Sequence, residues 1–183
     1  HTIVRNNLIE KVPGDGIVPI GCDSTLIEYN LMCDSPDILP MTEAAAGIWP
    51  WSCDNTIIQY NEVWGHKAPW DAQGFDSDYN CQNTLIQYNY SHDNYGGMVL
   101  ICNSGNAGDY SCGNIGSIVR YNISIGDGIR PKETRQGMFS PSIHIAGPVK
   151  QTLVERNIIH ANPKPSDAVD RTIITSDSWD GYA

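Results

Sequence analysis

The chain contains few basic residues and no long apolar run. Its 183 residues include 11 Lys and Arg against 21 Asp and Glu, so the formal net charge is −10. A chain without a basic stripe has little attraction for a nucleic-acid backbone, and we expect no nucleic-acid partner. No apolar segment approaches the length of a membrane span or resembles a signal peptide, so no membrane span is expected.

Motifs of several common chemistries are also absent from the sequence. The His and Cys residues do not have the spacing of zinc ligands. No glycine-rich phosphate loop occurs, and no serine lies in the tight turn that exposes an esterase nucleophile. Because these motifs are absent, the sequence predicts no metal site and no cofactor.

A pattern of six residues recurs along most of the chain. Each copy has Thr or Ser, two aliphatic residues, two variable residues and Asn. The copies start about 23 to 35 residues apart, a period in the range of solenoid proteins. The six copies are Thr2–Asn7, Thr25–Asn30, Thr56–Asn61, Thr84–Asn89, Ser117–Asn122 and Thr152–Asn157.

One coil of this solenoid is expected to contain three strands. The residues between Thr and Asn are β-branched, aliphatic or aromatic and form one strand, which the Asn closes with a turn. A strand that usually opens with Gly precedes it, as in Gly47–Cys53, and a short strand follows it, as in Asn89–His92. Stacked at the spacing of β-strands, the Asn side chains are predicted to form an asparagine ladder.

The repeat and the loops of varying length between coils resemble the right-handed parallel β-helix superfamily. This group includes pectate lyases, polygalacturonase-type glycoside hydrolases and other carbohydrate-active proteins. The resemblance implies an all-β fold, a right-handed single-stranded parallel β-helix solenoid of about six to seven coils, with Thr172–Asp177 as a possible seventh copy. It specifies the activity only weakly, because hydrolases, lyases, epimerases and binding spikes share this scaffold.

Residues 1–183 are expected to form a single β-helix domain. A solenoid needs capping at both ends. Neither end of this sequence looks like a cap, so we expect the chain to be an internal piece of a larger protein.

The cysteine positions allow two interpretations. Cys22, Cys53 and Cys81 each lie three residues before the Thr of a repeat and should stack in one column. They could form a disulfide across adjacent coils, or they could be buried thiols that fill the core. The second interpretation is favoured because three residues in a column cannot all pair. Cys102 and Cys112 are the best disulfide candidates.

Four loops that follow the third strand vary in length, near residues 34–46, 65–73, 93–96 and 126–141. Loops on a rigid scaffold often carry recognition. These loops lead into the Gly-opened strands. We therefore expect them to overhang the outer face of those strands and to form the walls of a groove.

Two Trp and two Asp residues are expected on that outer face. Alternate residues of a strand share a face, which places Trp49 and Trp51 outward on one strand and Asp76 and Asp78 outward on the next. Indoles offer flat platforms for sugar rings, and paired carboxylates can serve as acid and base or nucleophile in glycosidic cleavage. The alternatives are indoles packed under a loop, and a solvated strand face or Ca²⁺ site for the aspartates.

The strand that carries these aspartates is one residue longer than its neighbours, between Gly74 and Cys81. Counting back from Cys81 would turn both carboxylates toward the apolar core, which would be very costly. We therefore place a β-bulge near Asn80.

Further candidates for substrate binding lie in adjoining segments. A single His is more often a surface hydrogen-bonding residue than a catalyst. The candidates are His66, Trp70, Asp71, His92 and His144.

Three functions fit the sequence. A glycoside hydrolase that cleaves a polysaccharide or oligosaccharide with Asp76 and Asp78 is preferred, without a cofactor. A polysaccharide lyase would use a basic residue and Ca²⁺, but the basic cluster of Arg130, Lys132 and Arg135 is expected to lie too far from Asp76. A non-catalytic adhesin or glycan-binding spike is the third possibility. The resemblance implies a secreted, periplasmic or cell-surface protein, and the oligomeric state is not predicted.

Overall fold

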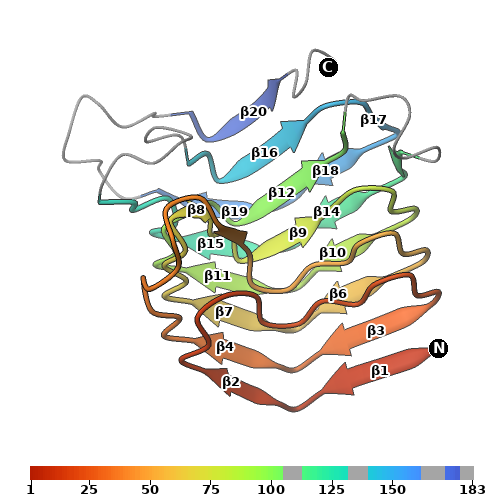
Figure 1. Cartoon of the computed structure of the whole chain (residues 1–183). Helices are drawn as coiled ribbons and strands as arrows, with labels where there is room; N and C mark the ends of the chain where they lie inside the picture. The colour runs from red at the N-terminus through yellow and green to blue at the C-terminus, as the bar shows by residue number, and fades with distance from the viewer. Residues whose placement is uncertain (105–112, 132–139, 162–171, 178–183) are drawn as a thin grey trace.

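The computed structural model describes residues 1–104, 113–131, 140–161 and 172–177. Within these residues the protein is a parallel β-helix, in which strands from successive coils stack on one another and the chain contains no α-helix (Figure 1). Accordingly, no helix long and apolar enough to cross a membrane occurs in the described part of the chain. The fold class is the one that the repeat predicted.

Strands of successive coils stack into three parallel sheets. The first sheet contains the strands of the Thr repeat, in the order β1 (Thr2–Arg5), β3 (Thr25–Glu28), β6 (Ile57–Gln59), β10 (Leu85–Gln87), β14 (Ile118–Arg120) and β18 (Leu153–Glu155). The second sheet contains β2 (Leu8–Glu10), β4 (Leu31–Cys33), β7 (Glu62–Trp64), β11 (Tyr90–His92), β15 (Ile123–Ile125) and β19 (Ile158–His160).

The third sheet is formed by β9 (Phe75–Ser77) and β12 (Val99–Cys102), which follow Gly74 and Gly97, and by β16 (Ile143–Ala146) and β20 (Ile174–Asp177), which no Gly opens. Isolated bridges extend it toward the N-terminus, from Phe75 to Ile48 and from Ile48 to Ile17. Gly opens the earlier strands of this sheet because the coils approach closely there: a Cβ on Gly47 would lie only 2.3 Å from the backbone oxygen of Gly74. A smaller parallel pair is β13 (Asn114–Ile115) with β17 (Val149–Lys150).

The strand assignment of the last repeat differs from the prediction. Ile174–Asp177 forms β20, which pairs with β16 in the third sheet. The segment from Thr172 therefore belongs to the third sheet and is not a seventh copy of the Thr repeat. Its pattern of Thr, two Ile and a final Asp imitates the repeat, but its pairing partner decides the sheet.

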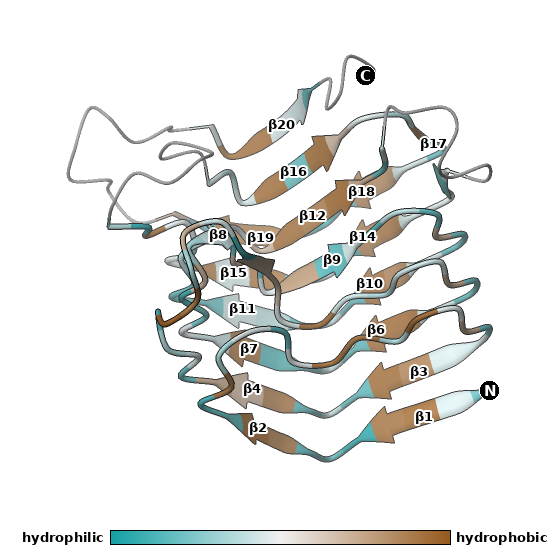
Figure 2. Cartoon of the chain, in the orientation of Figure 1, coloured by the Kyte–Doolittle hydropathy of each residue, from teal (hydrophilic) through white to brown (hydrophobic). Residues whose placement is uncertain are grey.

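The core runs along the inside of the coil. Alternating residues of all three sheets point inward, and Figure 2 shows the apolar residues distributed over strands of each sheet. Full burial of each aliphatic or aromatic side chain contributes about 1.5–3 kcal/mol. The buried members are Ile27, Met32, Ile48, Ile58, Val63, Phe75, Ile86, Met98, Val99, Ile101, Val119 and Ile143.

The Asn that ends each Thr strand bonds along the axis of the coil. Asn61 Nδ2 donates to Asn89 Oδ1 at 3.1 Å, and the backbone N of Asn61 donates to the same oxygen at 2.9 Å. Asn61 Nδ2 also donates to the backbone oxygen of Ile27. A polar side chain can therefore be buried at this corner with its partners in place. Side-chain amide bonds of this kind link Asn7, Asn30, Asn61, Asn89, Asn122 and Asn157 in sequence.

The cysteine column consists of free thiols. Cys22, Cys53 and Cys81 form no disulfide, and Cys53 and Cys81 are buried as the favoured interpretation predicted, whereas Cys22 is only half-buried. Burial raises the pKa of Cys81 to about 12, so its thiol stays protonated. Cys102 is also a free thiol, contrary to the disulfide predicted for it, and its candidate partner Cys112 lies outside the described residues.

Candidate active site

The outer face of the third sheet carries both aspartates of β9. Phe75 is fully buried in the core, and Ser77 points inward, where its hydroxyl lies 2.9 Å from that of Ser117. Asp76 and Asp78 alternate with them and line a cavity on the other side of the strand. The extended backbone of β9 thus places two carboxylates side by side.

A β-bulge at the end of β9 sets the direction of these carboxylates. The backbone N of Asp78 donates to Pro50, and the backbone oxygen of Tyr79 accepts from Ser52, so two residues oppose the single residue Trp51. The extra residue therefore lies at Asp78–Tyr79, directly before the predicted position at Asn80, which has a φ of 61°. The bulge brings the ring of Tyr79 to 5.1 Å from that of Trp51.

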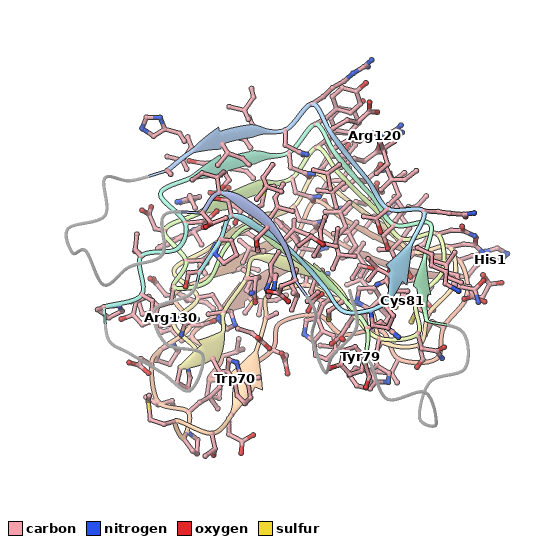
Figure 3. All side chains as sticks on the ribbon, turned by 90° about the horizontal axis from the view of Figure 1, so that it is seen from above. His1, Trp70, Tyr79, Cys81, Arg120 and Arg130 are labelled. Carbon is pink, nitrogen blue, oxygen red and sulfur yellow. The ribbon has the colours of Figure 1, made fainter. Side chains whose placement is uncertain are left out.

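A loop from each of two earlier coils covers this face. Strand β5 (Ala44–Ala45) pairs with strand β8 (Trp70–Asp71), and residues of both line the same cavity as Asp76 and Asp78. In Figure 3, which looks down the coil, the loop with Trp70 projects beyond the coil on one side of this face and Tyr79 lies on the other. Together they enclose a cavity of about 300 Å³. This acidic cavity is lined by Asp15, Ala44, Ala45, Ala46, Trp49, Trp51, Asp71, Asp76, Asp78, Tyr79, Leu100 and Cys102.

Asp76 is the most deeply buried carboxylate of the acidic cavity. It is 3% exposed, and its Oδ1 has no hydrogen-bond partner among the described residues. Burial raises the pKa of Asp76 well above its usual value, and the charges of Asp78, Asp71 and Asp15 raise it further. Both effects favour the protonated form of Asp76.

Asp78 is more accessible and better hydrogen-bonded. Its Oδ1 accepts from the backbone N of Tyr79 at 2.6 Å and from the Cys102 thiol at 3.2 Å. Burial raises the pKa of Asp78 to about 7, and the two hydrogen bonds oppose this rise because they favour the charged form. The two carboxyls of β9 thus differ in their ease of ionisation.

Asp15 belongs to the acidic cavity and was not among the predicted residues. Its Oδ1 accepts from the indole Nε1 of Trp49 and from the backbone N of Ala46, both at 2.9 Å. Asp15 therefore fixes the orientation of one indole and holds the loop over the cavity. Its only signal in the sequence is its place between Gly14 and Gly16.

The indoles are half-buried and lie on one wall of the acidic cavity. The ring centroids of Trp49 and Trp51 are 6.2 Å apart at an interplanar angle of 69°. Neither ring is fully covered, since both residues retain intermediate exposure. Trp51 is held by Tyr79 and Trp49 by Asp15, so this wall is rigid on both sides.

Asp71 lies on the covering strand β8 and is held there by Arg130. Arg130 is 4% exposed and donates from Nη2 to the backbone oxygen of Asp71 at 2.9 Å. Its Nη1 donates to the backbone oxygens of Ala68 and Pro69. Arg130 thus contacts the backbone of β8, the strand whose Asp71 lines the cavity. The other two basic residues of that cluster, Lys132 and Arg135, lie outside the described residues.

The predicted histidines lie away from the acidic cavity. His66 is fully buried, its Nε2 is 3.2 Å from the backbone oxygen of Gly14, and burial lowers its pKa to about 4. His92 is on β11 of the second sheet, where Nε2 is 3.1 Å from Glu62 Oε1. Neither residue contributes to the cavity lining, so the structure does not bring them together with the aspartates.

His144 and Trp70 lie near the acidic cavity but do not line it. His144 pairs with Leu100 on the third sheet, and Leu100 pairs with Asp76, so His144 lies two strands beyond the aspartates on the same face. Its Nε2 is 2.7 Å from Asp177 Oδ2. Trp70 lies on β8 beside Asp71 but does not line the cavity.

Among the described residues, two groups of side chains have metal-ligating atoms within 4.8 Å of one another. One is Asp76, Asp78 and Cys102 in the acidic cavity. The other is Glu10, Cys33 and Asp34 at the ends of strands in the second sheet.

The fold and the acidic cavity define a parallel β-helix protein with a covered carboxylate site on its third sheet. Comparison with solved structures finds the GH136 lacto-N-biosidase from Eubacterium ramulus in two crystal structures, both with a TM-score of 0.60. The identity is 27% for the native protein and 28% for the selenomethionine derivative. The match covers 87% of this chain and 28% of that enzyme, so the chain spans well under half of the enzyme's length. No family model and no curated protein sequence matches the chain.

Proposed function

We propose that the protein is a glycoside hydrolase whose reaction takes place in the acidic cavity. The observation that carries the proposal is the arrangement of Asp76 and Asp78, with oxygens within 4.8 Å of each other in a covered cavity that also contains two indoles. Glycosidic cleavage needs one protonated and one ionised carboxyl beside the scissile bond. The similarity to a β-helix glycoside hydrolase supports the same reaction class.

In this mechanism Asp76 is the general acid and Asp78 the nucleophile or base. Burial and neighbouring charges raise the pKa of Asp76, and in its protonated form it transfers the proton to the glycosidic oxygen as the C–O bond breaks. Asp78 ionises more easily, and its carboxylate attacks the anomeric carbon or activates water. The short distance between the two carboxyls favours the retaining route, in which water then hydrolyses a glycosyl ester of Asp78.

A second pairing uses Asp71 instead of Asp76. Asp71 faces the cavity from the covering strand β8 and is more exposed than Asp76. A carboxyl on a wall across from Asp78 could reach the leaving group from the other side. The effects of Asp71→Asn and Asp76→Asn on catalysis separate the two pairings.

The charge of the cavity favours a neutral sugar over a uronate. Four carboxylates line it, and none of its lining residues is Lys or Arg. A polyanionic substrate would be repelled. A lyase would also need a basic residue at the substrate, whereas Arg130 is buried against backbone oxygens. Hydrolysis of a neutral oligosaccharide is therefore preferred to β-elimination, and it agrees with a secreted, periplasmic or cell-surface location where such glycans occur.

The test compares hydrolysis with elimination on one enzyme preparation. The purified protein is assayed with an aryl lacto-N-bioside, a panel of neutral aryl glycosides and a polyuronate, each with and without EDTA. We expect release of the aryl group from a neutral glycoside, unaffected by EDTA. Ultraviolet-absorbing unsaturated uronate products that require Ca²⁺ would establish the lyase instead. Binding of oligosaccharides without any turnover would establish the glycan-binding protein.

A further inference from the structure

The acidic cavity contains a set of donor atoms that its hydrolytic role does not explain. Asp76 lies on β9, Asp78 directly follows that strand, and Cys102 ends the neighbouring strand β12 on the same outer face. Their ligating atoms lie within 4.8 Å of one another, and Cys102 Sγ is 3.2 Å from Asp78 Oδ1. A glycoside hydrolase needs the two carboxyls but has no use for a thiol between them.

An unpaired polar atom points to a cation at this place. Asp76 lines the cavity and is only 3% exposed. Its Oδ1 has no hydrogen-bond partner among the described residues. A buried carboxyl oxygen without a hydrogen-bond partner is unfavourable. The carboxylates of Asp15 and Asp71 line the same cavity and add to its negative potential. A cation that contacts Asp76 would give its Oδ1 a partner and would offset the negative potential of the cavity.

The donor set selects the kind of cation. Ca²⁺ and Mg²⁺ take oxygen ligands, six or more for Ca²⁺, whereas a thiolate with two carboxylates suits Zn²⁺ and chemically similar ions. A tetrahedral zinc site with bonds of about 2.0–2.3 Å holds its donors about 3.3–3.7 Å apart. Cys102 Sγ and Asp78 Oδ1 are 3.2 Å apart, and all three donors lie within 4.8 Å of one another. The cavity supplies the fourth, open position.

We propose that Asp76, Asp78 and Cys102 form a binding site for a thiophilic divalent cation of the Zn²⁺ type, and that the bound cation blocks hydrolysis. The ion and the substrate compete because the ion occupies both carboxylates of the proposed mechanism. Binding itself does not depend on the proposed function, but the inhibition does. Glu10, Cys33 and Asp34 provide an internal comparison, since they also include one thiol and two carboxylates.

The binding experiment uses Co²⁺ as a spectroscopic probe of thiolate ligation. The reduced protein is titrated with Co²⁺, and the near-ultraviolet thiolate-to-cobalt charge-transfer band is recorded, followed by its loss on displacement with Zn²⁺. We expect the band in the wild type and in Cys33→Ala, and its absence in Cys102→Ala and Cys102→Ser. Asp76→Asn should weaken Co²⁺ binding at least about tenfold, which corresponds to ~1.4 kcal/mol. Thermal unfolding of each variant checks that the fold is kept, and Cys102→Ser retains a hydroxyl donor toward Asp78.

Each outcome decides one of the two claims. No charge-transfer band in the wild type, or a band that survives in both Cys102 variants, overturns the site. A band lost only in Cys33→Ala would assign the cation to the second group. If the wild type hydrolyses glycosides, Zn²⁺ should inhibit it reversibly, with EDTA restoring activity and Cys102→Ser resisting inhibition. A Co²⁺ band at Cys102 in a protein without hydrolytic activity would keep the cation site and reject the proposed function.

Discussion

Arg130 and Asp71 are 59 residues apart in the chain, yet a guanidinium hydrogen of Arg130 bonds the backbone oxygen of Asp71 at 2.9 Å. Arg130 also bonds two further backbone oxygens of the preceding loop and is almost fully buried. A late coil of the solenoid thus fixes the covering strand of an earlier one. The position of one wall of the acidic cavity depends on this contact.

Replacing Arg130 should loosen that wall. Arg130→Lys keeps the charge but cannot bond several backbone oxygens at once, because lysine lacks the planar fork. We expect a loss of about 1.5–3 kcal/mol in the free energy of unfolding and faster tryptic cleavage after Lys67. Arg120→Lys, on the outer face of the first sheet, is the matched control. Equal cleavage rates in the wild type and Arg130→Lys would show that the contact does not hold the loop.

The aspartates of β9 should destabilise the folded protein at neutral pH. The pKa of Asp78 is about 7 in the folded protein against its usual value of 3.8. The folded state therefore binds more protons than the unfolded state between these values, and the free energy of unfolding falls as the pH rises from 3.8 to 7. Asp78→Asn removes this effect. Its melting temperature should exceed that of the wild type at pH 8, and the difference should vanish near pH 4.

Asp76→Asn should behave in the same way, since burial also raises the pKa of Asp76. Asp54→Asn, at an exposed position outside the acidic cavity, serves as the control for the substitution itself. A melting temperature of Asp78→Asn that is below the wild type at pH 8 would contradict the raised pKa.

Trp51 should contribute to sugar binding rather than to the fold. Trp51→Ala is expected to weaken oligosaccharide binding about tenfold, or ~1.4 kcal/mol, in calorimetric titration. Trp64, on the second sheet and stacked on His92, is an equally half-buried indole outside the cavity. Trp64→Ala should leave binding unchanged. If both variants bind as the wild type does, the indole wall has no role in recognition.

The Asn corner should stabilise the coil through its hydrogen bonds. Asn89 is 2% exposed and bonds both Asn61 and Asn122 through its side chain. Asn89→Leu leaves buried partners unsatisfied, and we expect a loss of about 1–3 kcal/mol in chemical denaturation. Gln87→Leu removes two part-buried side-chain bonds, to Gln59 and from Arg120, on the adjacent strand, and it should cost less because solvent can replace them. Similar losses in the two variants would count against a structural role of the Asn column.

The repeat allowed most of the fold to be predicted, because each coil reproduces the same strands. Thr, Asn and Gly recur at fixed places, and their spacing assigned the strands of Thr25–Asn30 or Gly47–Cys53 to their sheets. Where the sequence does not contain the rest of a coil, the repeat pattern assigns a strand to the wrong sheet. The segment from Thr172 has the letters of the Thr strand, but it pairs with β16 in the third sheet.

The candidate site could be predicted only in part. Alternation along β9 places Asp76 and Asp78 on one face, which is a local property that a sequence contains. The contacts of Asp15 with Trp49 and of Arg130 with Asp71 span 34 and 59 residues through irregular loops, and no periodicity encodes them. His66 was a candidate because its loop leads to the cavity, but its ring turns inward toward Gly14.

The central claim is that the carboxyls of Asp76 and Asp78 carry out glycoside hydrolysis. The most direct test measures kcat/KM of the wild type, Asp76→Asn, Asp78→Asn and the control Asp54→Asn on one aryl glycoside that the wild type cleaves. We expect each β9 variant to lose about 10²–10⁴-fold while melting at or above the wild-type temperature, and Asp54→Asn to keep full activity. Wild-type rates in either β9 variant, with the fold intact, would contradict the assignment.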